Sequence, residues 1–234
     1  MSIERYSVID KKNAREIVLL KSTACKWGNC SFCDYIHDNS DDVEQIIELN
    51  KEILSCVTGN YGQLEIINSG SCFELPTETL KDIRDIVEDK NVGTLYFESH
   101  FMYRNRLDEI RDFFNTKIVF KCGIETFDQT FREEILKKGA KFQTPEDVSK
   151  HFSSICLMVG IKGQTKEMIQ KDIEILETHF EKGCINVFVD NTTDIKGDPE
   201  LIKWFEQKYA YLEDEPSIEV LWHNTDFGVG GDNE

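Results

Sequence analysis

The sequence predicts an α/β protein: a partial (β/α)6 barrel of largely parallel strands, with a seventh strand near the C-terminus. Continuously apolar runs alternate with amphipathic stretches along the chain, which is typical of parallel strands buried under helices. Polar stretches rich in glycine, cysteine or asparagine follow these runs, at the strand ends where barrels carry their functional loops. The 234 residues, 40% of them hydrophobic, are enough for one barrel, so we expect a single domain over residues 1–234.

Seven apolar runs are the expected strands, and helical stretches separate them. The strands are expected at residues 15–22, 63–68, 93–99, 117–125, 153–160, 184–190 and 217–223. The helices are expected at residues 41–57, 77–88, 105–114, 128–139, 166–180 and 199–210, with a short extra helix at 144–148.

Two helix starts carry recognisable signals. Ser40 is the expected N-cap of the first helix, and Thr144 caps the short extra helix with Pro145 in its first turn. At helical spacing, one face of the first helix collects Val43, Ile46, Ile47, Asn50, Leu54 and Val57. We expect this face to pack against the sheet.

Composition limits the class of protein. The net charge of −17, from 27 basic and 44 acidic residues, repels a phosphate backbone and argues against a nucleic-acid substrate. No window approaches the roughly 20 apolar residues of a membrane span. The cysteines at 56, 72, 122, 156 and 184 follow no disulfide spacing, so we expect most of them to be small core residues in a soluble, cytoplasmic protein without membrane contact.

The stretch "CKWGNCSFC" contains the sharpest chemical signal. Cys25, Cys30 and Cys33 follow the first expected strand directly. Three thiolates can hold three irons of a cubane cluster and leave the fourth iron open to an external ligand. A structural zinc loop completed by a distant ligand such as His37 is the alternative, because closed zinc sites take four ligands.

At these residues the chain resembles the radical S-adenosylmethionine (SAM) superfamily. The likeness covers nearly the whole length and includes the cysteine loop, Phe32, the glycine-containing segment "NSGS", and the stretches "GIETFDQTFREEILKKG" and "LMVGIKGQTKEMIQKDIEIL". The usual spacing in that superfamily is CxxxCxxC, whereas here four residues separate Cys25 from Cys30. The resemblance implies a radical SAM partial barrel with a 4Fe-4S cluster, SAM as cofactor, and the three cysteines as catalytic cluster ligands.

The resemblance also implies roles for individual residues. Phe32 would pack on the SAM adenine, and Arg132 would meet the SAM carboxylate. Glu98 and Glu125 would accept hydrogen bonds from the SAM ammonium or ribose hydroxyls. The remaining residues expected to bind SAM lie after the second and fifth strands: Asn68, Ser69, Gly70, Ser71 and Gly160.

The loops after the sixth and seventh strands are the expected substrate contacts. They offer Asn, Asp and His side chains without a basic cluster, which suits a neutral or cationic polar molecule. The residues expected there are Asn191, Asp194, His223, Asn224 and Asp226. The alternative is that these are turn and capping residues.

The chain looks most similar to the queuine lyases of bacterial queuosine salvage. That resemblance implies removal of the cyclopentenediol from queuine to give 7-aminomethyl-7-deazaguanine (preQ1), and a reducing partner such as flavodoxin or ferredoxin. Two other classes stay open: a radical SAM enzyme acting on tRNA or another polar small molecule, and a non-catalytic metal-binding module.

Overall fold

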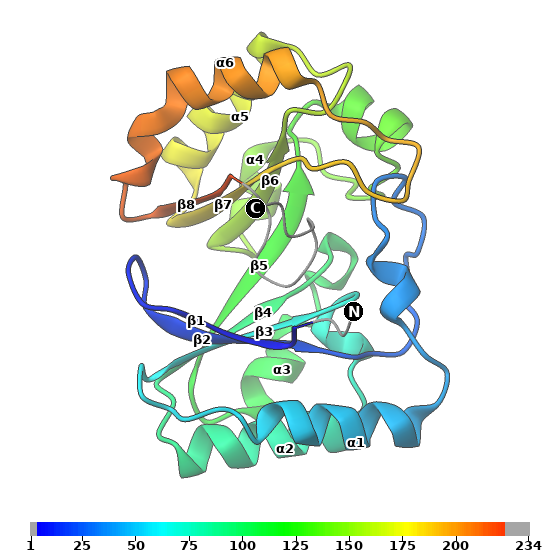
Figure 1. Ribbon diagram of the computed structural model, residues 1–234, viewed down its shortest axis with the longest axis vertical. Helices are drawn as coiled ribbons and strands as arrows, with labels where there is room; N and C mark the ends of the chain where they lie inside the picture. The colour runs from blue at the N-terminus through cyan, green and yellow to red at the C-terminus, as the bar shows by residue number, and fades with distance from the viewer. Residues whose placement is uncertain (1–3, 223–234) are drawn as a thin grey trace. The chain divides into compact units, whose positions relative to one another are not determined.

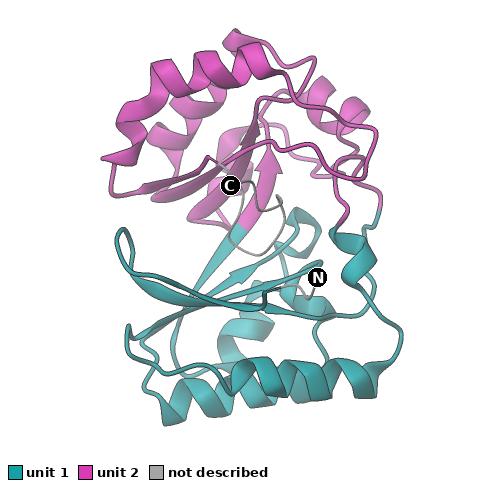
Figure 2. Ribbon diagram, viewed as in Figure 1, with its two compact units in different colours: residues 1–28, 35–121 teal, residues 29–34, 122–234 magenta. Residues whose placement is uncertain are grey.

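The computed structural model describes residues 4–222 and divides into two compact units. Unit 1 comprises residues 1–28 and 35–121, and unit 2 comprises residues 29–34 and 122–234 (Figure 2). The eight strands form one sheet in sequence order from β1 to β8. The strand β5 (Lys117–Glu125) continues from unit 1 into unit 2. A single domain over the whole chain stays a prediction.

Unit 1 is a sheet with helices on one side (Figure 1). Its other strands are β1 (Tyr6–Ile9), β2 (Arg15–Leu20), β3 (Gln63–Asn68) and β4 (Thr94–Glu98). Its helices are α1 (Val43–Leu54), α2 (Thr77–Asp89) and α3 (Leu107–Phe113). The strands β2 to β5 are parallel as predicted, whereas β1 pairs antiparallel with β2. The prediction missed β1 because a run of only four residues is too short to show a clear strand pattern.

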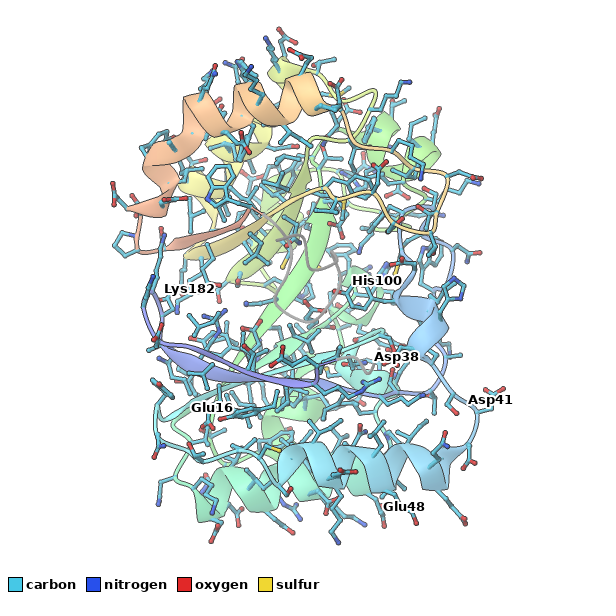
Figure 3. All side chains as sticks on the ribbon, in the orientation of Figure 1. Glu16, Asp38, Asp41, Glu48, His100 and Lys182 are labelled. Atoms are coloured by element: carbon cyan, nitrogen blue, oxygen red, sulfur yellow. The ribbon has the colours of Figure 1, made fainter. Side chains whose placement is uncertain are left out.

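Buried acids hold the sheet of unit 1 together. Glu16 accepts hydrogen bonds from the backbone nitrogens of Thr58 and Gly59, both at 2.7 Å, and from the Tyr6 hydroxyl at 2.8 Å. Burial alone would raise the pKa of Glu16, but these hydrogen bonds lower it below its ordinary value. Glu16 therefore fastens β1 and the loop after α1 onto β2 (Figure 3).

A second buried acid, Glu65 of β3, binds two cations. Its carboxylate lies 2.5 Å from Arg15 Nε of β2 and also pairs with Lys121 of β5. Burial would raise the pKa of Glu65, whereas Lys121 and Arg15 lower it below its ordinary value. By register, Glu65 lies beside Ile17 and Tyr96, and Lys121 lies beside Glu98, so Arg15, Glu65 and Lys121 share one face of the sheet.

Unit 2 contains the end of β5 and three further parallel strands. These are β6 (Ser154–Val159), β7 (Lys182–Val187) and β8 (Ile218–Leu221). Its helices are α4 (Pro145–Ser149), α5 (Lys166–His179) and α6 (Pro199–Tyr209), and α5 and α6 cover one side of β6 to β8 (Figure 1). A Cβ atom at Gly183 would come within 2.4 Å of the Leu176 side chain, so glycine in β7 allows α5 to pack closely.

The structure corrects three details of the predicted elements. The N-cap of α1 is Asp42, which accepts from Gln45 N at 3.0 Å, and not Ser40. Val43 is 44% exposed and does not belong to the buried face of α1. The helix expected at residues 128–139 is shorter: residues 129–130 are α-helical and lead into a π-helical turn, Phe131–Ile135, after which Lys137 and Gly139 adopt positive φ angles. Two left-handed residues so close together end the turn.

No helix within residues 4–222 is long and apolar enough to cross a membrane.

The predicted cap of α4 is confirmed. Thr144 is its N-cap, Asp147 completes a capping box, and Pro145 lies in the first turn.

Candidate functional site

The loop that carries the first cysteine is anchored where β2 ends. Asn50 of α1 is fully buried and pairs with the backbone of Lys21, accepting from its nitrogen and donating to its oxygen, both at 2.8 Å. Its amide also donates to Thr79 of α2 at 3.3 Å. This buried asparagine lies on the predicted inner face of α1, and it fixes the chain four residues before Cys25.

The segment Asn68–Ser71 lies against Cys25 within unit 1. A Cβ atom at Gly70 would lie 3.5 Å from Cys25 Cβ, so glycine permits the two loops to approach. Asn68 turns the segment back on itself by donating from Nδ2 to Ser71 O at 3.1 Å. Its Oδ1 is buried and has no hydrogen-bond partner. A buried acceptor without a donor is uncommon and suits a ligand that brings one.

Asn39 provides a second tie between these loops, which the sequence reasoning missed. With its amide nitrogen facing Ser69, Asn39 donates to Ser69 O at 3.1 Å, and its oxygen accepts from Cys25 N at 3.1 Å. One side chain thus holds the first cysteine and the segment after β3. Glu98 ends β4 in the same unit, half-buried and opposite Lys121 in register.

The other two cysteines belong to unit 2 and surround a buried aromatic residue. Phe32 is 8% exposed and packs in a cluster with Phe131, Leu136, Ile161 and Phe188, against which Cys30 and Cys33 also pack. Asn191 donates from Nδ2 to Phe32 O at 2.7 Å. The neighbouring Thr192 donates to Asp34 at 3.2 Å from its hydroxyl. The loop after β7 therefore holds the segment of the second and third cysteines.

Glu125 of the "GIET" segment forms a largely buried ion pair with Lys138. Glu125 has a φ of 67° and pairs with Lys138, Oε1 to Nζ at 2.7 Å. A Cβ atom at Gly123 would lie 2.7 Å from Glu125 Oε1 and 2.9 Å from Lys138 Nζ, so a larger residue there would displace the ends of both side chains. Lys138 Nζ lies 5.7 Å from the Phe32 ring centroid. Burial would lower the pKa of Lys138, but the charge and the hydrogen bond of the Glu125 carboxylate raise it above its ordinary value.

Arg132 lies in the interior of unit 2, at 1% exposure. It donates from Nη1 to Thr126 O at 3.1 Å and pairs with Glu133 at 3.0 Å, and its guanidinium lies 3.8 Å from the Phe142 ring centroid. Burial lowers the pKa of Arg132. These contacts fix the loop after β5, and a direct contact of Arg132 with SAM stays a prediction.

The other expected residues have mixed placements. Gly160 has a φ of 87°, and a Cβ atom there would lie 2.3 Å from Ile202 Cγ1 of α6. Glycine at position 160 therefore allows α6 to pack against this segment. Asp194 is exposed in the loop after β7. Asn191 is engaged with Phe32 and with Thr193, and its contact with substrate stays a prediction. His223, Asn224 and Asp226 lie outside the described residues.

The eight cysteines fall into three groups by exposure. Cys25, Cys30 and Cys33 form no disulfide and are partly exposed, whereas Cys72, Cys122, Cys156 and Cys184 are buried and Cys56 is exposed. Burial raises the pKa of Cys72 above its ordinary value. Within residues 4–222, no three His, Cys, Asp or Glu side chains are arranged around a single ion. In a cubane each thiolate binds its own iron.

The residues present fit a three-thiolate cluster and a bound SAM. The cysteine loop offers three partly exposed thiols. The segment next to Cys25 lacks a side chain at Gly70, which lets backbone or ligand approach closely, and it carries the unpaired acceptor Asn68 Oδ1. The amino group of SAM can supply the hydrogen-bond donor that this acceptor lacks.

Comparisons with known proteins agree with this chemistry. A queuine lyase from Clostridium spiroforme, solved bound to SAM and queuine, is 50% identical and covers 98% of this chain and 100% of its own, with a TM-score of 0.95. A radical SAM methyltransferase from Sphaerobacter thermophilus, 14% identical, covers 88% of this chain and 65% of its own at a TM-score of 0.56, which bears on the fold alone. The likenesses confirm the predicted partial barrel.

A curated relative is less informative. The uncharacterized protein MJ0550 of Methanocaldococcus jannaschii is 25% identical in an alignment that covers 83% of this chain. The chain spans only 59% of that protein's length. No family model matches the sequence.

Proposed function

This chain belongs to the family of the queuine lyases, and we propose that it cleaves the cyclopentenediol from queuine to give 7-aminomethyl-7-deazaguanine, with SAM and a 4Fe-4S cluster as cofactors. The observation that carries the proposal is the 50% identity, over 98% of this chain, to a queuine lyase solved with SAM and queuine. The three partly exposed thiols on one loop support it independently.

The cofactors supply the reactivity, and the chain supplies position. When bound, the cluster and SAM provide a 5′-deoxyadenosyl radical that removes a hydrogen atom from the substrate. Cys25, Cys30 and Cys33 are the cluster ligands. Asn39 restrains the backbone of Cys25, and Asn191 restrains that of Phe32. Restraint of this kind matters because small displacements of reacting groups cost large factors in rate.

Polar groups of the chain orient SAM and substrate. Asn68 Oδ1 would accept from the SAM ammonium, and Gly70 would leave the backbone accessible to it. The Glu125 carboxylate is an acceptor whose orientation is restrained by its ion pair with Lys138, for which Gly123 leaves space. The loop after β7 contributes Asp194 to the substrate contacts. A flavodoxin or ferredoxin supplies the electron.

The direct test uses the protein purified without oxygen. Reduced enzyme given SAM and free queuine should form 5′-deoxyadenosine and 7-aminomethyl-7-deazaguanine, both measured by chromatography with mass detection. Replacing Cys25, Cys30 or Cys33 by Ala should bleach the brown colour and abolish both products, because each change removes one of three thiolate ligands. Cys56→Ala, at an exposed position outside the loop, is the matched control and should keep the iron.

Other outcomes would select the alternatives. If SAM is cleaved only with queuosine-containing tRNA or another amine, the lyase activity is refuted and radical chemistry is retained. Bound zinc without SAM cleavage would identify a metal-binding module.

A further inference from the structure

Glu74 lies at the meeting point of three loops of unit 1. It follows β3 in a short 3-10 turn, Cys72–Glu74, and is 8% exposed. Its Oε2 accepts from Ser71 N at 2.5 Å. Its Oε1 accepts from the Tyr103 hydroxyl at 2.5 Å and from Lys26 N at 3.4 Å. The carboxylate therefore contacts the cysteine loop, the segment after β3 and the turn after β4.

The backbone of Glu74 adds to the same junction. Its carbonyl accepts from Thr23 N at 3.2 Å and from Thr23 Oγ1 at 2.9 Å. Glu74 is therefore bonded to the chain both before Cys25, at Thr23, and after it, at Lys26. Gly70 is also close to the carboxylate, because a Cβ atom built at Gly70 would lie 3.2 Å from Glu74 Oε2. Glu74 is thus bonded to Thr23 and Lys26, close to Cys25 on either side, and to Ser71, next to Gly70.

Tyr103 is held so that it donates to this carboxylate. Its ring stacks on Phe73 at 4.5 Å between centroids, and Arg106 lies 5.6 Å from the Tyr103 centroid. Burial and the bond to Glu74 raise the pKa of Tyr103, so the hydroxyl keeps its proton. With three donors on two oxygens, the carboxylate is largely saturated and acts through the groups it holds.

We propose that Glu74 is a positioning residue for SAM binding, because it sets the backbone of Asn68–Ser71 relative to Cys25. This inference rests on the proposed function, in which that segment holds the amino end of SAM. Charge-assisted bonds between loops are stronger than neutral ones, and here they join the first cluster ligand to the cofactor segment.

The principal test measures SAM affinity of the iron-loaded protein. Glu74→Ala should weaken SAM binding about tenfold or more, the factor for losing a hydrogen bond to a charged group. Glu74→Gln should restore part of it, because an amide oxygen can still accept from Ser71 N. Tyr103→Phe removes one donor and should weaken binding by a smaller factor. Glu78→Gln changes an exposed carboxylate paired with Lys81 and should have no effect.

A spectroscopic readout separates positioning from loss of folding. The electron paramagnetic resonance spectrum of the reduced cluster should respond less to saturating SAM in Glu74→Ala, while its iron content stays at the wild-type level. Because neither readout needs queuine, a wild-type protein that binds SAM but leaves queuine intact would refute the lyase activity and leave the role of Glu74 measurable.

The metal-free protein provides the second measurement. Hydrogen exchange followed by mass spectrometry should show residues 23–28 and 68–75 losing protection together in Glu74→Ala, because one carboxylate serves both. If Glu74→Ala does not fold, Tyr103→Phe gives the same comparison with a milder change. Wild-type SAM affinity in folded Glu74→Ala, or loss of protection in only one of the two segments, would overturn the proposal.

Discussion

At the scale of single residues, the buried carboxyl group of Asp172 in α5 has too few hydrogen-bond donors around it. It is 1% exposed, and its Oδ1 accepts from Phe127 N at 2.7 Å, whereas Oδ2 has no partner. Burial, partly offset by bonds from Thr126 and Phe127, raises the pKa of Asp172 to about 7. Its ionisation in the folded protein therefore takes place near neutral pH.

The sign of the resulting pH dependence follows from linkage. A folded pKa raised above the unfolded value gives stability that is present at low pH and is lost as the pH rises through about 7. The free energy of unfolding should fall by about 1.4 kcal/mol between pH 6 and pH 8 from this group alone. Denaturant unfolding of the wild type and of Asp172→Asn measures the difference.

Asp172→Asn should remove this part of the slope, because the amide does not titrate. Glu174→Gln, an exposed neighbour on α5, is the control and should keep the wild-type slope. Equal slopes for the wild type and Asp172→Asn between pH 6 and pH 8 would contradict the assignment.

At the scale of elements, the loop after β7 acts as a clamp on the cysteine segment of unit 2. Asn191 bonds the carbonyl of Phe32, and the backbone and hydroxyl of Thr192 bond Asp34. The side chain of Asn191 is itself oriented by Thr193, whose nitrogen and hydroxyl donate to its oxygen at 3.0 and 2.7 Å. Asparagine suits this position because its amide both donates to the Phe32 carbonyl and accepts from Thr193.

Asn191→Leu should make the cluster easier to remove without preventing its assembly. The change leaves the Phe32 carbonyl without its donor, at a cost of about 1–3 kcal/mol, but all three thiolates remain. Iron release to a chelator should be several-fold faster than in the wild type. Glu200→Gln, an exposed change at the start of α6, should release iron at the wild-type rate. Release from Asn191→Leu at that same rate would show that the clamp does not restrain the cluster.

At the scale of the whole molecule, the net charge of −17 bears on the choice between a free base and a nucleic acid. A protein that binds a polyanion neutralises phosphates with Lys and Arg and shows a steep salt dependence. Acidic side chains such as Asp41 and Glu48 stand on the surface of unit 1, with Glu48 on the side of α1 away from the sheet (Figure 3).

Turnover of free queuine should therefore be insensitive to tRNA. Addition of bulk tRNA should leave the initial rate unchanged, and raising the salt from low to physiological concentration should alter it little, because no phosphate contacts are broken. The rate of 7-aminomethyl-7-deazaguanine formation is the measurement. Strong inhibition by tRNA would point to a nucleic-acid site and to the tRNA-modifying alternative.

By itself, the sequence determined the order of β2 to β8 and of most helices, because local periodicity encodes which side chains face a core. It also determined the three-thiol loop, because thiolate chemistry depends on residue type and spacing. Only the tertiary structure showed that Glu74 and Asn191 hold that loop. Asn191 and Phe32 are 159 positions apart, and a hydrogen bond across such a separation leaves no periodic signal. The π-helical turn at Phe131–Ile135 was equally hidden, because buried Arg132 and left-handed Lys137 override a good helical pattern.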